Sequence, residues 1–90
     1  MSKVRNIVVV KDGNTKQYPG YIFKRTLYEA EVKNIFGWRK IAYIYTEIHH
    51  DNGDREFFWD MVSGGKVSEH IIRATQWQTT LLDGEEDGSE

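Results

Sequence analysis

The pair Asn52-Gly53 constrains the fold of this chain more than any other feature of its sequence. It lies within residues 39–62, where stretches rich in β-branched and aromatic residues precede and follow it. Asn-Gly is the preferred pair for a two-residue type I′ turn, because both central residues of that turn need a positive φ. The sequence therefore predicts one long antiparallel β-hairpin over residues 39–62.

A two-residue turn also predicts the register of this hairpin. On one face the opposite pairs would be His50 with Arg55, Ile48 with Phe57, Thr46 with Trp59, and Ile44 with Met61. The other face would carry Tyr43, Tyr45 and Phe58. A sheet face that meets water is normally polar, so we expect more of this chain, a second subunit or a partner to cover the aromatic face. We also expect Trp59 to be buried against Thr46.

Two further strands are predicted before the hairpin. Residues 4–10 (VRNIVVV) form a β-branched run that is typical of a buried strand. Residues 12–14 have the composition of a turn, and a second strand is expected from Gln17 through Phe23. Pro19 has no N–H donor, so it should lie at an edge or at the start of that strand.

Residues 26–36 fit two different structures. Thr26 and Glu29 have the spacing of a helix capping box, and a stripe at helical spacing follows: Tyr28, Val32, Ile35 and Phe36. A strand is the alternative, because Tyr28, Ala30 and Val32 alternate as they would in a sheet. We favour the helix, which would cover one face of the hairpin.

The segment after the hairpin predicts a second helix. Ser68 can cap its N-terminus, with Val67 packed against Ile72. Threonines at positions 75, 79 and 80 leave a strand over residues 69–77 as an alternative. Residues 83–90 contain only Gly, Ser and acidic residues, so we expect a disordered acidic tail there.

Together these elements indicate a small α+β domain over residues 1–82, followed by the tail. Its antiparallel sheet would have three to five strands, built on the long central hairpin, with one or two helices packed against it. A small all-β barrel of the SH3-like kind is the alternative.

Composition and motifs exclude several classes of protein. The chain has 90 residues and no cysteine, which excludes disulfides, thiol nucleophiles and cysteine-based zinc sites. It contains no phosphate-binding loop, dinucleotide-binding glycine motif or serine-nucleophile motif, so we expect no catalytic residues and no cofactor. No apolar run approaches the ~20 residues that cross a membrane, and no signal-peptide pattern opens the chain. We therefore expect a cytoplasmic protein without a membrane partner.

The hairpin tip contains the one cluster of potential metal ligands. It consists of His49, His50, Asp51 and Asp54. Because neighbouring strand residues point to opposite faces, His49 and His50 cannot easily bind the same ion. We expect a polar turn rather than a metal site.

Charge is distributed unevenly along the chain. Residues 1–40 hold nine Lys/Arg and three Asp/Glu, whereas residues 41–90 hold three Lys/Arg and eleven Asp/Glu. Such a two-signed chain suggests complementary surfaces or head-to-tail contacts, unless the two halves interleave in the fold.

These observations favour a non-catalytic protein-binding module, such as an inhibitor, an adaptor or a regulatory accessory protein encoded by a phage or mobile element. The expected partner is another protein, and self-association is a further expectation. The candidate binding surface combines the aromatic face, the cations beside it and the acidic tail: Tyr43, Tyr45, Phe58, Arg39, Lys40, Asp83, Glu85, Glu86 and Asp87. Aromatic rings beside cations also bind single-stranded nucleic acid, so such a module is one alternative. A small structural or assembly protein is the other.

Overall fold

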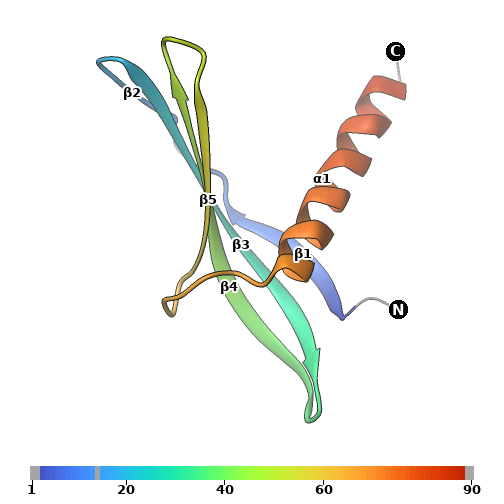
Figure 1. The fold of residues 1–90 in the computed structure, drawn as a ribbon. Coiled ribbons are helices and arrows are strands. Elements are labelled where there is room, and N and C mark those ends of the chain that lie inside the picture. The colour runs from blue at the N-terminus through green and yellow to red at the C-terminus, as the bar shows by residue number, and fades with distance from the viewer. Residues whose placement is uncertain (1–2, 14, 89–90) are drawn as a thin grey trace.

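The computed structural model describes residues 3–13 and 15–88, and for residues 79–88 it describes the backbone alone. This part of the chain forms five strands and one helix: β1 (Val4–Lys11), β2 (Thr15–Tyr18), β3 (Tyr21–Asn34), β4 (Gly37–His50), β5 (Arg55–Met61) and α1 (Glu69–Gly88). The strands form one antiparallel sheet in the order β1-β3-β4-β5, and β2 pairs with the other end of β3. The helix lies on one side of this sheet (Figure 1). The sheet is open, so the predicted α+β arrangement agrees with the structure and the alternative of a closed barrel is wrong.

The β3–β4 hairpin is the longest unit of the sheet, and it overturns the predicted helix at residues 26–36. β3 and β4 pair along 14 residues each, from Tyr21 opposite His50 to Asn34 opposite Gly37. A lone helix of that length is marginal in water, whereas a strand satisfies its backbone along the whole of β4. The alternation of apolar residues along β3 was therefore the better guide to its structure.

Ile35 and Phe36 form the turn of this hairpin instead of part of a helical stripe. The side-chain oxygen of Asn34 accepts a hydrogen bond from the backbone N–H of Phe36 at 2.8 Å, and Gly37 follows with a φ of 115°. An asparagine side chain that bonds the backbone two residues later is a common turn device. It favours reversal of the chain at this point.

The β2–β3 connection corrects the single strand predicted over residues 17–23. Tyr18 pairs with Tyr21, so the chain reverses at Pro19-Gly20. Gly20 has a φ of 89°, as the third residue of a type II turn requires, and proline is favoured just before it. Pro19 therefore lies in a turn between two strands.

The β4–β5 turn is one residue longer than the sequence predicted. The N–H of Gly53 donates to the carbonyl of His50 at 3.0 Å, and the N–H of His50 donates to the carbonyl of Asp54 at 2.8 Å. Gly53 has a φ of 95°, which matches a three-residue loop that ends in a left-handed glycine. The side chain of Asn52 favours this loop by accepting the N–H of Asp54 at 2.9 Å.

This extra residue shifts the predicted register by one position. Tyr45 pairs with Trp59, and Thr46 pairs with Phe58. A shift of one residue moves every side chain of a strand to the other face, so the predicted grouping of Tyr43, Tyr45 and Phe58 on one face is wrong. Trp59 does not pack against Thr46 across the ladder, and it is half-buried.

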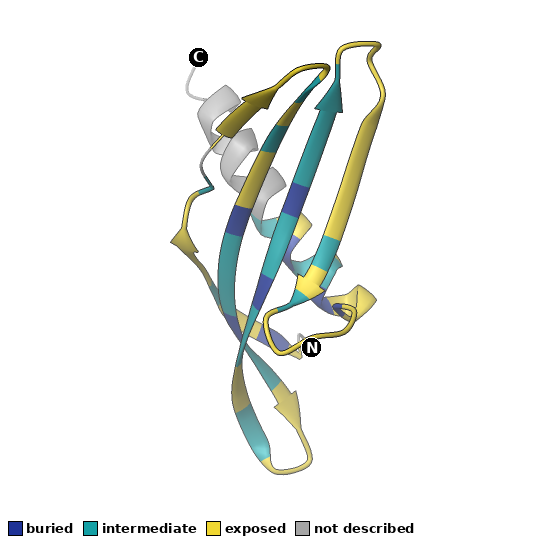
Figure 2. Ribbon diagram, turned by 90° about the vertical axis from the view of Figure 1, so that its left-hand side faces the viewer, coloured by how far each residue is buried: buried dark blue, intermediate teal, exposed yellow. Residues whose placement is uncertain are grey.

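β1 is a strand, but the prediction that it is buried is wrong for most of its length. Val4 is 5% exposed, whereas Val8, Val9 and Val10 are each about half exposed. The strand lies at the sheet edge, and its register with β3 shifts twice, next to Asn6 with its φ of 55° and again before Lys11. Figure 2 shows that the buried positions gather on β3 and β4, while the outer strands are mainly exposed.

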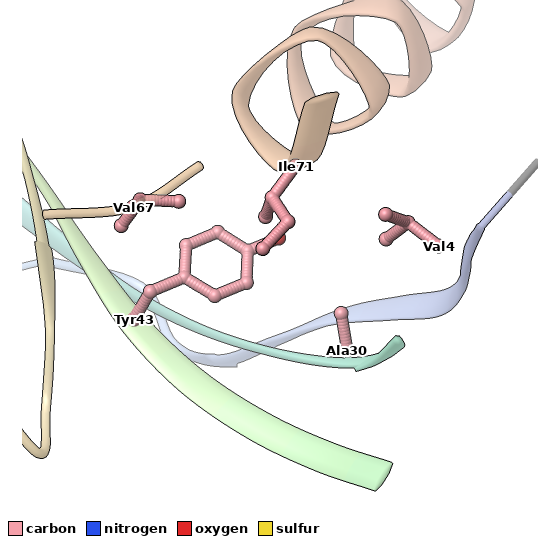
Figure 3. Packing of buried hydrophobic residues seen from close by; sticks show 5 residues of the cluster. All are labelled: Val4, Ala30, Tyr43, Val67 and Ile71. Carbon is pink, nitrogen blue, oxygen red and sulfur yellow. The ribbon is translucent and has the colours of Figure 1, made fainter. Parts of the chain in front are cut away.

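The core lies where the N-terminal half of α1 meets the centre of the sheet. It is formed by Val4, Ala30, Tyr43, Val67 and Ile71 (Figure 3). The predicted helix start is confirmed, because α1 begins at Glu69 directly after Ser68, and Ile72 packs against this core. The helical backbone continues to Gly88. The role of residues 83–90 as an acidic tail and the domain boundary at residue 82 stay predictions, since the side chains from residue 79 onward lie outside those described.

Candidate binding surface

The register divides the side chains of the sheet between two faces. Tyr43 of β4 lies in the core with Ile71 of α1, so it marks the face that we call the helix side. Its direct partners, Tyr28 on β3 and Met61 on β5, lie on the same side. We call the other side the open face and define it by the alternate residues: Phe23, Leu27, Ile44, Ile48 and Phe58.

A chain of aromatic rings crosses the helix side from the core to the outer strand. The ring of Tyr43 lies 5.4 Å from that of Tyr28 and 6.2 Å from that of Trp59. Trp59 lies 4.4 Å from Tyr45, which stacks on Phe57 at 6.2 Å with an interplanar angle of 3°. Exposure rises from 0% at Tyr43 to 51% at Phe57. The core therefore reaches the surface as aromatic rings at the β5 edge.

Glu47 joins this ring cluster to a polar network. Its carboxylate accepts a hydrogen bond from the Tyr45 hydroxyl at 2.8 Å and lies 2.9 Å from Nε2 of His49. Burial raises the pKa of Glu47, but the hydrogen bonds from His49 and Tyr45 outweigh it and hold the pKa below its ordinary value of 4.5. Burial and the neighbouring Glu47 raise the pKa of Tyr45. The network thus keeps a carboxylate and a neutral phenol together beside the rings.

A shallow hollow of about 330 Å³ lies next to this network. Val9 and Asp12 of the β1 end, Lys24 and Tyr28 of β3, and Glu47 of β4 are among its lining residues. The lining carries charges of both signs, so nothing in it selects an anion or a cation. We regard the hollow as part of the helix side and not as a separate site.

β5 is the outer strand of the sheet. Its hydrogen bonds show which of its residues bond β4 and which point outward; we call this alternation the phase of the ladder. The N–H of Val62 donates to the carbonyl of Ala42 at 3.1 Å, and His50 bonds Asp54 in the same register. Bonded and non-bonded pairs alternate in an antiparallel ladder. The even-numbered residues of β5 therefore bond β4, and the backbone N–H and C=O groups of Arg55, Phe57 and Trp59 point away from the sheet.

One end of this outer edge is already covered. The N–H of Met61 donates to the carbonyl of Gly65 at 3.0 Å, and Lys66 forms a bridge with Asp60. The Met61 bond confirms the deduced phase, because odd-numbered residues of β5 bond outward. Among the described residues, no strand covers the stretch from Arg55 to Trp59. This stretch is about five residues of open sheet edge, with the rings of Phe57 and Trp59 on its helix side.

The aromatic residues nominated from the sequence occupy different environments. Tyr43 is completely buried in the core, whereas Tyr45 is half-buried on the helix side. Phe58 lies on the open face opposite Thr46 and is 44% exposed. The structure therefore brings Tyr45 next to Trp59 and Phe57, and it separates Tyr45 from Phe58.

The nominated charges also lie apart. Arg39 pairs with Val32, which places it on the helix side near the β3–β4 turn. Lys40 lies on the open face, opposite Glu31, with its Nζ 4.0 Å from a carboxylate oxygen of Glu29. The remaining four residues belong to the end of α1, where no side chains are described: Asp83, Glu85, Glu86 and Asp87.

The histidines of the predicted metal-ligand cluster are engaged separately. His49 lies beside Glu47, and Nε2 of His50 lies 2.6 Å from Glu56 on the open face. In the described part of the chain, no group of three or more His, Cys, Asp or Glu side chains has the arrangement of a metal site.

Sequence reasoning missed the β5 edge because the predicted register placed Phe57 and Trp59 on the wrong face. A usable signal was present nonetheless. β5 is the last predicted strand before a helix, and the last strand of a sequence of hairpins often remains at an edge of the sheet.

Comparisons with protein-family models, curated proteins and solved structures give no match to this chain. No helix in the described residues has the length and apolar character to cross a membrane. The functional argument therefore depends on the geometry of the surface.

Proposed function

We propose that this chain is a non-catalytic protein-binding module, of the inhibitor, adaptor or regulatory accessory kind, that binds an extended segment of its partner along the β5 edge. The observation that carries the proposal is the outward direction of the backbone groups of Arg55, Phe57 and Trp59. An extended peptide can add to such an edge as another strand, and main-chain hydrogen bonds then supply affinity.

The side chains of the edge indicate which segments would fit. Phe57 is half exposed and Trp59 is half-buried on the helix side, so every second residue of the added segment would contact these rings. We therefore expect a segment of about five residues in which apolar and polar residues alternate. The bond between Met61 and Gly65 limits its length, because it closes the C-terminal end of the edge.

The alternative of a single-stranded nucleic-acid module has less support from the rings. Stacking needs exposed ring faces, and Tyr43 has none. Tyr45 is stacked on Phe57 and holds Glu47, whose negative charge would repel a phosphate group.

The test is a selection of random decapeptides on the full-length chain, followed by amide hydrogen exchange of the selected complexes. We expect alternating apolar peptides and slower exchange of the amides of Phe57 and Trp59. Unchanged exchange at these two amides in every complex would overturn the proposal.

Proline substitutions provide a matched pair of controls. Phe57→Pro removes an outward N–H to which no strand in the described part of the chain bonds, so the fold should survive and peptide binding should be lost. Phe57→Ala removes the same ring but keeps the N–H, so it should retain part of the binding. Phe58→Pro removes an N–H that bonds β4, and it should lower the melting temperature instead. Equal peptide binding by Phe57→Pro and the unmodified chain would contradict strand addition at this edge.

A further inference from the structure

The open face of the sheet carries an ordered gradient of charge. The strand register aligns three of its rows beside β5: Lys16-Phe23-Ile48-Glu56 and Lys11-Leu27-Ile44-Asp60, which run from β2 or β1 to β5, and Arg25-Thr46-Phe58, which runs from β3 to β5. The first two rows begin with a lysine, continue through two apolar residues and end with an acidic residue. The third row begins with an arginine and ends with a phenylalanine. In these three rows the face thus has a basic border on β1 and β2, a centre on β3 and β4 that is apolar apart from Arg25 and Thr46, and an acidic border on β5.

The two lysines of the basic border lie around one hollow, together with the neighbouring Arg25 of β3. Lys11, Lys16 and Arg25 line this hollow of about 270 Å³, whose apolar lining includes Leu27 and Ile44. Gly13 of the β1–β2 loop also lines this hollow, where the loop lies close to the backbone of β3. A Cβ at position 13 would lie 1.1 Å from the carbonyl oxygen of Arg25, so only glycine allows the loop to approach β3 this closely.

An antiparallel sheet often leaves one face in water, but such a face is normally polar, and the apolar residues of this one are the exception. Strands bury one face against another layer, and α1 supplies that layer on the helix side only (Figure 1). In the described part of the chain, no helix or strand packs on the open face, and Phe58 there is 44% exposed. A second layer must therefore come from another molecule if the apolar centre is to be buried.

We propose that this second layer is another copy of the same chain, packed open face to open face about a two-fold axis parallel to the strands. Such an axis keeps each residue at its level along the strands and exchanges the two borders. Lys16 then meets Glu56 of the other copy, and Lys11 meets Asp60 of the other copy. Between these borders, Phe23 packs over the second copy's Ile48.

The charges select this arrangement against the other face-to-face one. A two-fold axis across the strands would place basic border on basic border, and like charges at an interface cost several kcal/mol. An axis along the strands makes both borders complementary at once. Each of the two charged contacts occurs twice in the dimer, as an isologous interface requires.

The size of the face suits a stable dimer. Strands lie ~4.8 Å apart and rise ~3.4 Å per residue. The open face therefore spans roughly 600–700 Å² of flat area per copy. This area does not include the additional surface of the projecting side chains. A standard interface buries ~800 Å² per partner, so the face is close to the required size.

The test is sedimentation equilibrium of the full-length chain and of two charge-reversed variants. One variant, Lys11→Glu with Lys16→Glu, makes both borders acidic, and the other, Glu56→Lys with Asp60→Lys, makes both borders basic. We expect the unmodified chain to be dimeric and each variant alone to dissociate with a Kd raised at least about tenfold. An equimolar mixture of the two variants should form heterodimers, because every border then meets its opposite.

Circular dichroism of each variant checks that the monomers remain folded, and the recovery of dimers in the mixture itself requires both to be folded. A monomeric unmodified chain at 100 μM would overturn the proposal. Homodimers that persist unchanged in both variants would also overturn it, since they would place self-association elsewhere, for example at the β5 edge. A mixture of folded variants that stays monomeric would exclude the proposed axis.

Discussion

The Tyr43 hydroxyl lies 2.6 Å from Oγ1 of Thr75, and this contact ties the sheet to the helix. Thr75 uses its single hydroxyl proton to donate to the carbonyl of Ile71 at 2.8 Å, so Tyr43 is the donor of the pair. Both residues are among the most buried of the described chain. Burial raises the pKa of Tyr43, which keeps the phenol neutral. Together with the packing of Ile71 and the bond from the Gln78 amide to the carbonyl of Ile7 at 3.0 Å, this hydrogen bond fixes where the helix meets the sheet.

We predict that Thr75→Val destabilises the protein more than Tyr43→Phe does. Valine leaves the buried Tyr43 hydroxyl without an acceptor, which costs about 1–3 kcal/mol, whereas phenylalanine removes the donor and leaves Thr75 bonded to Ile71. Urea unfolding of both single variants and the double variant measures the coupling between the two residues. Strictly additive losses would show that the two hydroxyl groups do not interact.

Gly13→Ala should be the most damaging alanine substitution in the β1–β2 loop. The new Cβ would overlap the carbonyl oxygen of Arg25, a backbone atom that β3 holds in place. The loop would have to move away from β3, at a cost of about 1–3 kcal/mol or more. The control is Thr15→Ala, an exposed neighbour in β2 for which we expect a change within about 0.5 kcal/mol. Equal melting temperatures for the two variants would contradict the close approach of this loop.

Gly53→Val should lower the free energy of unfolding by about 1–3 kcal/mol, because a β-branched residue is poorly tolerated at a φ of 95°. Nothing lies within 4 Å of the added Cβ, so backbone strain alone causes the loss. Gly53→Asn is the matched control, since asparagine adopts this conformation more readily and should lose less. Thermal unfolding of the two variants distinguishes strain from the mere loss of a glycine.

The Gly53 turn shows how far the sequence could predict the fold. Asn52-Gly53 correctly located the hairpin, since both a two-residue and a three-residue loop use this pair. The choice between the loops depends on a local bond from Asp54 to the Asn52 side chain, which adds one residue and exchanges the faces of β5. Hairpin position was therefore predictable, and the face of Phe58 was not.

β3 illustrates a second limit. Thr26 and Glu29 satisfy a helix-capping pattern, and a single sequence weighs that local pattern against alternation without knowing the partner strand. The 14 residues of β4 decide the outcome, because they provide hydrogen bonds along the whole length of β3. The helix start at Ser68 was predictable because its local capping signals agree with the fold: among the described residues, no strand pairs with that segment. The edge position of β5 had a signal in the sequence, but the outward direction of the backbone groups of Phe57 and Trp59 followed only from the observed hydrogen bonds.

Acid should remove a contribution that Glu47 makes to stability. The hydrogen bonds from His49 and Tyr45 hold the folded-state pKa of Glu47 below its ordinary value of 4.5, so the folded protein favours the charged carboxylate. A lowered pKa gives a stabilisation that is complete above the unfolded-state value and is lost as the pH falls through the folded-state value. We therefore expect Glu47→Gln to be less stable than the unmodified chain by about 1 kcal/mol at pH 6.

This difference should shrink as the pH falls below 4.5, because the unmodified chain then also carries a neutral side chain at position 47. Urea unfolding at several pH values between 6 and 3 measures the difference directly. Glu69→Gln is a suitable control, because Glu69 is exposed on α1 and forms an ion pair with Arg73 one turn away. Its substitution should change stability by a few tenths of a kcal/mol at most. A stability gap for Glu47→Gln that stays constant from pH 6 to pH 3 would mean that packing of the side chain, and not its charge, supports the rings beside the β5 edge.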